Sequence, residues 1–478
     1  MTQNVTKQKP LDPNWVTLHS VPFKVRKFSK YDFEQFELIR DAYFSSGGFY
    51  TGKYLVRGPR EELAKYNYRV ENKKYTNFTA PVVDGLVNPI LYRDPVRDSD
   101  SDLVDAFIQT PTLSDHTNLT TFMHEQTTNA LLFGGVFIVE DNFSEVDQPA
   151  SINEAMDNRV FPYLYSVEPL NIQYYAFDRF GRLTYLSYCI GTDGDMEDII
   201  QVHRLSLESD VASGLIGSVG VPISYITDIS NKAPTEVTET NSLPYFYKLA
   251  RQYDNQIFPV SVVSALADAS KNMFQINSLI LYQHTQLTFP ILTYNGQPST
   301  EMSLSEDSVL FYSQNHAKPE YISPQSDTLE MLYKDRENTK NDIHEMTHQA
   351  MNQISSSASG EARKQADKMR QETLSFIEKR MIDLEKWIFN QFNEFTGVGG
   401  DIEITYQSNL DSDGVENDIQ QIGDILERFS VSEDTSVKLK LKVLRKVFSS
   451  MSESQFNEIE VSEEQNREHG DEPPRDDI

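Results

Sequence analysis

The stretch from residue 362 to residue 396 limits the possible folds of this chain more than any other part of the sequence. Apolar or small residues recur there at helical spacing until Gly397: Ala362, Ala366, Met369, Thr373, Phe376, Ile377, Met381, Leu384, Ile388, Phe392 and Phe395. This spacing predicts one continuous helix with a single apolar face. Because helices in globular proteins average about 10–14 residues, a helix of this length is expected to cross a whole subunit.

Two further long helices are predicted upstream, and they flank a segment with the character of strands. The first covers residues 259–286 and the second residues 328–352. The stripe of the second helix is only half apolar, as expected where helices of neighbouring copies share a surface: Leu329, Leu332, Thr339, Ile343, Met346 and Ala350. Between the two helices, residues 288–294 and 308–312 are predicted strands, and Asn295-Gly296 is a hairpin turn.

The first 258 residues mix helical and strand patterns. Helices are expected at 31–40, 61–70 and 118–132, and strands at 136–139, 163–167, 172–177, 182–190 and 199–205. Between Leu215 and Val237 the Gly, Ser and Thr content rises, which predicts a long exposed loop. The mixture of elements places the fold in the α+β class.

The charge of the chain is strongly negative. It has 72 acidic and 43 basic residues among 478, a formal net charge of -29. A protein that grips DNA phosphates needs clustered Lys and Arg, so this balance argues against tight DNA binding. It does not argue against loose passage of DNA, because acidic walls would repel a sliding polyanion. The alternative interpretation is that the acidic excess only aids solubility.

Neither a membrane span nor a secretory signal is predicted. No apolar run reaches the length of about 18 residues that a spanning helix needs, and residues 1–10 are polar. The single cysteine, Cys189, lies in an apolar, aromatic stretch and is expected to be an inert, buried thiol. These features fit a protein that stays in a reducing cytoplasm.

The order of elements in the second half resembles the portal proteins of tailed bacteriophages. A long helix, a small strand-rich insert, a second helix, a Ser/Ala/Gly loop and a very long helix match the family's stem, clip, stem, tunnel loop and spine. The segments that carry the resemblance are 355–362 (SSSASGEA), 402–410, 66–69, 75–86 and 134–139. The resemblance covers roughly residues 30–450.

The resemblance implies a portal-like fold with a mixed wing domain, long stem helices, a small β-rich clip and a helical crown. The corresponding boundaries are 1–258 for the wing with its N-terminal arm, 259–286 and 328–352 for the stem helices, 287–327 for the clip, 353–361 for the tunnel loop, 362–410 for the spine helix and a wing strand, and 411–452 for the crown. Residues 453–478 carry ten acidic and two basic residues and are expected to be disordered.

The same resemblance implies a function without enzymatic activity and without a cofactor. Portal proteins form a ring, expected here to be a dodecamer, at one vertex of the capsid, and double-stranded DNA passes through it during packaging and ejection. The implied partners are the terminase, head-tail adaptor or neck proteins, the major capsid protein and scaffolding protein, with no membrane partner. The implied location is the virion, after assembly in the cytoplasm of the host bacterium.

Two groups of residues are candidate functional sites under this resemblance. The tunnel loop would bring Ser355, Ser356, Ser357, Ser359 and Gly360 to the DNA, with Lys364 at the start of the following helix. Serine hydroxyls can contact phosphates without reading sequence. The alternative is that this segment is a plain linker between helices. In the clip, the residues expected on the docking surface are Tyr294, Asn295, Gly296, Phe311 and Tyr312.

One motif points to a different function. His344-Glu-Met-Thr-His348 has the HExxH spacing that places two imidazoles on one helix face for Zn²⁺, with Glu345 as the general base. Its flanks are polar, and no motif marks a third ligand among Glu372, Glu378 and Glu385. The alternatives are therefore a zinc metalloprotease or a solvated pair of histidines. A generic virion scaffold or interaction protein is a third possibility, because an α+β order alone does not fix function.

Overall fold

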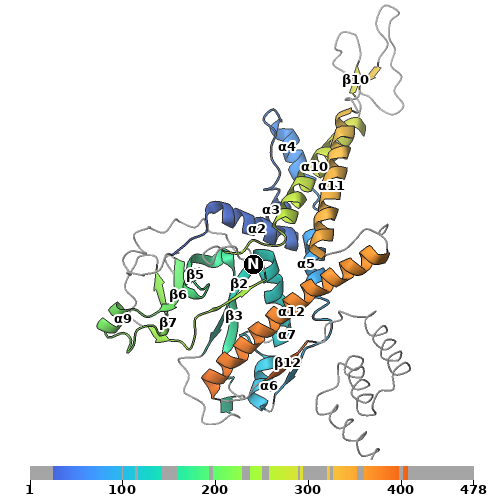
Figure 1. Ribbon diagram of the computed structural model, residues 1–478. Coiled ribbons are helices and arrows are strands. Elements are labelled where there is room, and N and C mark those ends of the chain that lie inside the picture. The colour runs from blue at the N-terminus through green and yellow to red at the C-terminus, as the bar shows by residue number, and fades with distance from the viewer. Residues whose placement is uncertain are drawn as a thin grey trace, which may run out of the picture. The chain divides into compact units, whose positions relative to one another are not determined.

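The computed structural model describes residues 25–99, 101–113, 117–142, 154–155, 159–192, 198–228, 237–249, 258–288, 291–293, 320–322, 327–351, 360–397 and 402–406 (Figure 1). It has the α+β fold predicted from the sequence. The chain divides into two compact units. Unit 1 comprises Met1–Phe33, Val83–Val262 and Ser357–Ile478, and unit 2 comprises Glu34–Val82 and Val263–Ser356.

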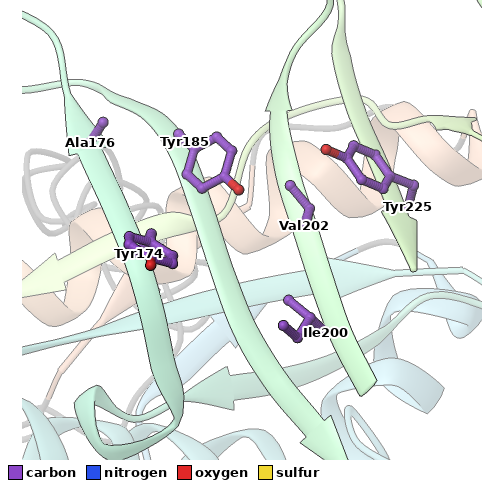
Figure 2. Packing of buried hydrophobic residues seen from close by; sticks show 6 residues of the cluster. All are labelled: Tyr174, Ala176, Tyr185, Ile200, Val202 and Tyr225. Carbon is purple, nitrogen blue, oxygen red and sulfur yellow. The ribbon is translucent and has the colours of Figure 1, made fainter. Parts of the chain in front are cut away.

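Unit 1 contains a five-stranded antiparallel sheet. Its order is β4 (Ile172–Phe177), β5 (Leu183–Thr192), β6 (Asp198–Leu205), β7 (Pro222–Asp228) and β8 (Thr238–Glu239). A short 3-10 helix (Pro169–Asn171) precedes β4, and α9 (Glu208–Ala212) follows β6. Figure 2 shows the buried cluster on this sheet, formed by Tyr174, Ala176, Tyr185, Ile200, Val202 and Tyr225.

The long loop predicted between Leu215 and Val237 is wrong in its central part, because β7 lies there. This strand pairs with β6 over its whole length, from Leu205 opposite Pro222 to Ile199 opposite Asp228. Ile223 and Tyr225 are buried on one face of β7, whereas Ile226 is exposed. The alternation has the period of a strand, but the flanking Gly and Ser residues obscured it.

A second sheet of unit 1 has the order β3 (Tyr163–Val167), β2 (Gly135–Asp141) and β9 (Tyr245–Lys248). The helix predicted at 118–132 and the strand predicted at 136–139 are confirmed here. Helix α7 (Leu119–Phe133) is capped by the side chain of Asn118, which accepts a hydrogen bond from the amide of Thr121. Gly134 then turns the chain with φ at 85°, and a Cβ on it would lie 2.5 Å from the carbonyl oxygen of Pro259.

Aromatic side chains connect the two sheets of unit 1. Phe137 of β2 stacks on Phe246 of β9, with ring centroids 4.7 Å apart, and Phe246 lies 5.0 Å from Phe177 of β4. Phe258 is 5.2 Å from Phe246 and 5.1 Å from Phe28. The core of unit 1 is therefore largely aromatic at the junction of its sheets.

The predicted very long helix is confirmed as α12 (Gly360–Thr396), which has 37 residues and belongs to unit 1. The apolar residues of its buried face are Leu374, Ile377, Met381, Leu384, Ile388, Phe389 and Phe392. Phe392 packs on Phe107 of α6 (Asp102–Gln109), with ring centroids 4.5 Å apart. Nearby, β1 (Val96–Asp98) pairs with β12 (Glu403–Thr405), which confirms the strand expected after the long helix.

Unit 2 contains the two other long helices, α10 (Ser264–Thr288) and α11 (Asp327–Met351). Both were predicted within a few residues of their ends. Between them, β10 (Ile291–Thr293) and β11 (Glu320–Ile322) form an antiparallel pair. The remaining helices are α2 (Lys30–Phe44) and α5 (Thr79–Val87), which cross the division between the units, and α3 (Gly47–Thr51) and α4 (Leu63–Glu71) of unit 2.

Several sequence predictions fall outside the described residues. They are the strand at 308–312, the crown at 411–452 and the acidic tail at 453–478. The partner strand of β10 is β11, which the sequence did not indicate. Cys189 was expected to be buried, but its side chain is partly exposed at an irregularity between β5 and β6. Its thiol donates to the carbonyl oxygen of Gly191 over 3.3 Å, and burial raises its pKa.

Candidate assembly site: the α10–α11 hairpin

Helices α10 and α11 form a hairpin that is closed near the strand pair. The His284 ring on α10 hydrogen-bonds through Nε2 with the hydroxyl of Tyr333 on α11, and the two ring centroids are 5.8 Å apart. The guanidinium of Arg336 lies 5.3 Å from the ring centroid of Tyr333. Beyond this contact, Ile291 pairs with Ile322, so the chain leaves and returns at one end of the hairpin. Figure 1 shows α10 and α11 side by side below β10.

Helix α10 is fixed to the N-terminal part of unit 2 by a buried arginine. Arg69 of α4 forms a two-pronged ion pair with Glu61, with N–O distances of 2.7 Å for both prongs. It also donates to the hydroxyl of Ser278 on α10 and to the carbonyl oxygen of Val56. Its side chain is 1% exposed, and the ion pair lowers the pKa of Glu61. With most of its donors used, this arginine is a strong structural clamp.

Helix α11 has very little buried surface of its own. Ile343 is the only side chain of α11 that is buried among those described, at 1% exposed, whereas Met331 is 57% exposed. The helix carries six acidic and three basic residues, a balance of -3. By contrast, α10 buries eight side chains, including Leu266, Met273 and Phe274. The exposed face of α11 is thus a long surface without a partner in the described chain.

The HExxH motif lies on α11, as predicted. His344 and Glu345 are exposed, and His348 lies one helical turn further on, with a side chain outside the described set. Of the candidate third ligands on α12, Glu372 is exposed and Glu385 is held in a buried ion pair. Among the side chains that the structure describes, no group of three His, Cys, Asp or Glu residues is arranged to hold a metal ion.

The other candidate residues lie partly outside the described chain. This holds for the clip residues Tyr294, Asn295, Gly296, Phe311 and Tyr312, and for the loop residues Ser355, Ser356, Ser357 and Ser359. Gly360 is the first residue of α12. Lys364 lies in the first turns of α12, as expected at the start of that helix.

A buried polar network fixes the middle of α12 and was missed by the sequence analysis. Arg97 of β1 pairs with both carboxylate oxygens of Glu385, at 2.8 and 2.7 Å, and Tyr406 donates a hydrogen bond to the same carboxylate. Burial alone would lower the pKa of Arg97, but the bond to Glu385 raises it above its usual value. Burial also raises the pKa of Tyr406. No local motif announces such a network, because its members are almost 300 residues apart, at positions 97 and 385.

A hydrogen-bonded chain of rings lies in the sheets of unit 1. The hydroxyls of Tyr165 and Tyr188 are 2.9 Å apart, and the Tyr188 hydroxyl is 3.0 Å from Nε2 of His203. His203 is 3% exposed, its Nδ1 has no hydrogen-bond partner among the described residues, and burial lowers its pKa to about 4. The imidazole is therefore neutral at pH 7 and serves as a core residue.

Comparisons with known proteins find likeness among solved structures only. No family model matches the chain, and no curated protein matches it. Among solved structures, the chain is similar to one described as the neck of an empty GTA particle computed with C6 symmetry. The similarity has a TM-score of 0.43 and 11% sequence identity, and it covers 80% of this chain and 95% of that one. Within the described part of the chain, no helix is both long and apolar enough to cross a bilayer.

Proposed function

We propose that this chain is the subunit of a ring-shaped phage portal, the head-tail connector through which double-stranded DNA is packaged and ejected. One observation carries the proposal. Two helices of 25 residues each form a hairpin that bears a strand pair at its end, and the second helix buries only Ile343 among its described side chains. The site has the character of an assembly surface, and the proposed role is structural rather than enzymatic.

The exposed length of α11 favours many copies over a single molecule. A helix of 25 residues is about 37 Å long, and helices of this length gain most of their stability from tertiary packing. Packing within the chain covers only one side of α11. Met331 of α11 is 57% exposed, and Leu281 of α10 is 39% exposed. Side-by-side copies would cover these residues. If each copy uses two different surfaces and the rotation closes, the product is a ring.

The charge of the hairpin suits a conduit for DNA. The balance of -3 on α11 is part of the net charge of -29 of the chain. A wall of this sign holds no DNA phosphate tightly, so the polyanion can slide. Within this proposal, residues 294–319 form the docking surface for terminase and neck proteins, and the Ser355–Ser359 segment lies nearest to the DNA. The ATP-driven motor is then a separate protein, since this chain lacks a phosphate-binding loop motif.

Electron microscopy of the negatively stained, purified protein tests the ring directly. We expect a closed ring with an axial opening, and sedimentation should give a mass of many chains, with twelve as the expected number. Met331→Asp should weaken the ring, because it places a charge in the shared helix surface. Val219→Asp is the matched control, since both residues are 57% exposed and Val219 lies outside the hairpin. A solitary chain, or an assembly without an opening, would contradict the proposal.

The docking role has its own test. Replacing residues 294–319 with a short Gly/Ser linker keeps the β10–β11 pair, so rings should still form. Binding of purified terminase to these rings should be lost, whereas the unaltered ring binds it. If these rings still bind terminase, the docking role of this segment is wrong, whereas the proposal of a ring is unaffected.

A further inference from the structure

A charged aromatic knob stands at the turn between β4 and β5. Phe180 is 61% exposed, and two guanidinium groups flank its ring, with that of Arg179 at 4.6 Å and that of Arg182 at 5.2 Å from the ring centroid. Both distances are within the range of about 6 Å for cation–π contacts. The two arginines make this turn locally basic, whereas the chain as a whole is acidic, with 72 acidic and 43 basic residues.

The backbone holds the knob in one shape. Asp178 and Arg182 form the closing hydrogen bond of the turn, 2.8 Å from amide to carbonyl, and Gly181 takes φ of 78°. The carboxylate of Asp178 accepts hydrogen bonds from the amides of Phe180 and Arg182, at 2.8 and 2.9 Å. Aromatic residues and arginine are the commonest anchors of protein interfaces, and a rigid loop loses little entropy on binding. The knob therefore has the residue types and the rigidity that favour binding to another protein surface.

An acidic face with the opposite character lies elsewhere in unit 1. Asp98 of β1 and Glu403 of β12 stand directly opposite each other in the strand register, and both are exposed. Like charges in such a pair repel each other. Among the described residues, neither carboxylate forms an ion pair with a lysine or arginine. Asp105 of α6 is a further exposed carboxylate close by in the sequence. Figure 1 shows α6 and β12 apart from β6 and β7.

We propose that the knob at Arg179–Arg182 docks on the Asp98–Glu403 face of a second copy of this chain. This inference rests on the proposed ring, which needs a contact between two different surfaces of identical subunits. The charges are complementary, since two guanidinium groups would meet two carboxylates that otherwise repel each other. Phe180 would lose water at the centre of the contact.

A charge exchange tests this contact. The variants are Arg179→Glu/Arg182→Glu, Asp98→Lys/Glu403→Lys and all four substitutions together, studied by sedimentation over a range of protein concentrations. Each pair alone should raise the concentration at which the assembly half-dissociates by at least about tenfold, because like charges then face each other. The fourfold variant should return to within about threefold of the unaltered protein. The effect should shrink in 1 M salt, where screening is strong.

Controls separate this contact from its alternatives. Arg60→Glu/Lys65→Glu makes the same change in net charge at exposed positions of unit 2 and should leave the half-dissociation concentration within about twofold. Absence of rescue in the fourfold variant would overturn the proposed contact. So would unchanged assembly together with loss of salt-sensitive DNA binding in Arg179→Glu/Arg182→Glu, which would make the knob a nucleic-acid contact. If the unaltered chain does not assemble at all, the proposed ring fails first.

Discussion

The long helices α11 and α12 differ in what holds them. Helix α12 buries a continuous apolar face against unit 1 and has a two-pronged ion pair in its middle, between Glu385 and Arg97. In α11, Ile343 is the one buried side chain among those described, and the ion pair of Glu337 with Lys340 lies on the surface at 3.7 Å. Helix α12 is therefore fixed by contacts within unit 1, whereas most of the described side chains of α11 are exposed.

The contrast shows that helical spacing alone does not reveal whether an apolar helix face packs within its own chain or against another copy. Both helices have apolar residues at intervals of three and four, yet the stripe of α11 is interrupted by polar residues such as Thr339. A half-apolar stripe is too weak for a core and too apolar for permanent exposure to water. This intermediate character is the expected property of a surface that identical copies share.

The largest expected effect comes from breaking the buried ion pair of α12. Glu385→Ala leaves the charge of Arg97 buried without its carboxylate, which should reduce the free energy of unfolding by about 3–5 kcal/mol. In α11, Glu337→Ala should cost at most about 1 kcal/mol, because its partner remains in water. Hydrogen exchange resolved by peptide would measure the loss at β1, β12 and α12 separately from α11. Equal losses for the two variants would erase the contrast between the helices.

Acid should act on unit 1 before it acts on the hairpin. His203 has a folded-state pKa of about 4, whereas histidine in an unfolded chain titrates near 6.5. Between these values the unfolded state binds a proton that the folded state refuses, so stability falls as the pH falls from 6.5 to 4. The loss amounts to about 3 kcal/mol over that window.

The variant His203→Gln isolates this contribution. Glutamine can still form a hydrogen bond with the hydroxyl of Tyr188 but does not titrate. The pH dependence of exchange at β5 and β6 should therefore be flatter in the variant, while that of α10 and α11 stays the same as in the unaltered protein. A variant with the full acid sensitivity of the original would show that other groups cause it.

Much of the fold follows from local patterns in the sequence. The bounds of β3, β4, α7, α11 and α12 agree with the predictions within a few residues, because each element has a clear period and a clear stop, such as Gly134 or Gly397. The strand β7 was missed since its alternation is short and lies among Gly and Ser residues. The pairing of β1 with β12 could not be predicted, because it joins segments that are distant in the sequence.

The candidate sites were less predictable than the fold. The hairpin helices follow from their periodicity, and the half-apolar stripe of α11 already indicated a shared surface. The knob around Phe180 has no such signal, because cation–π contacts and a rigid turn appear only once the chain is folded. The same is true of Asp98 and Glu403, whose proximity depends on strand register.

The smallest expected effect concerns a buried carboxyl group near the end of α12 that lowers the stability of the folded state. Both carboxyl oxygens of Glu140 on β2 are buried and have no hydrogen-bond partner within the part of the chain that the structure describes. Burial, together with the charge of Glu394 on α12, raises the pKa of Glu140 well above the usual value. The folded state then keeps a proton that the unfolded state releases, so stability is lost as the pH rises. Glu140→Gln should be more stable than the unaltered protein at pH 8 and no more stable at pH 4. Urea unfolding measures this difference.

The matched control for Glu140→Gln is Glu372→Gln, which changes an exposed carboxylate on α12, the helix that carries Glu394. It should leave the stability the same at both pH values, because water solvates the charge in both states. If Glu140→Gln is equally neutral at pH 8, the carboxyl group has found a partner such as bound water or a cation. The Glu140 carboxyl group would then have a partner in the folded state. The contrast between the well-packed helix α12 and the exposed surface of α11 would be larger.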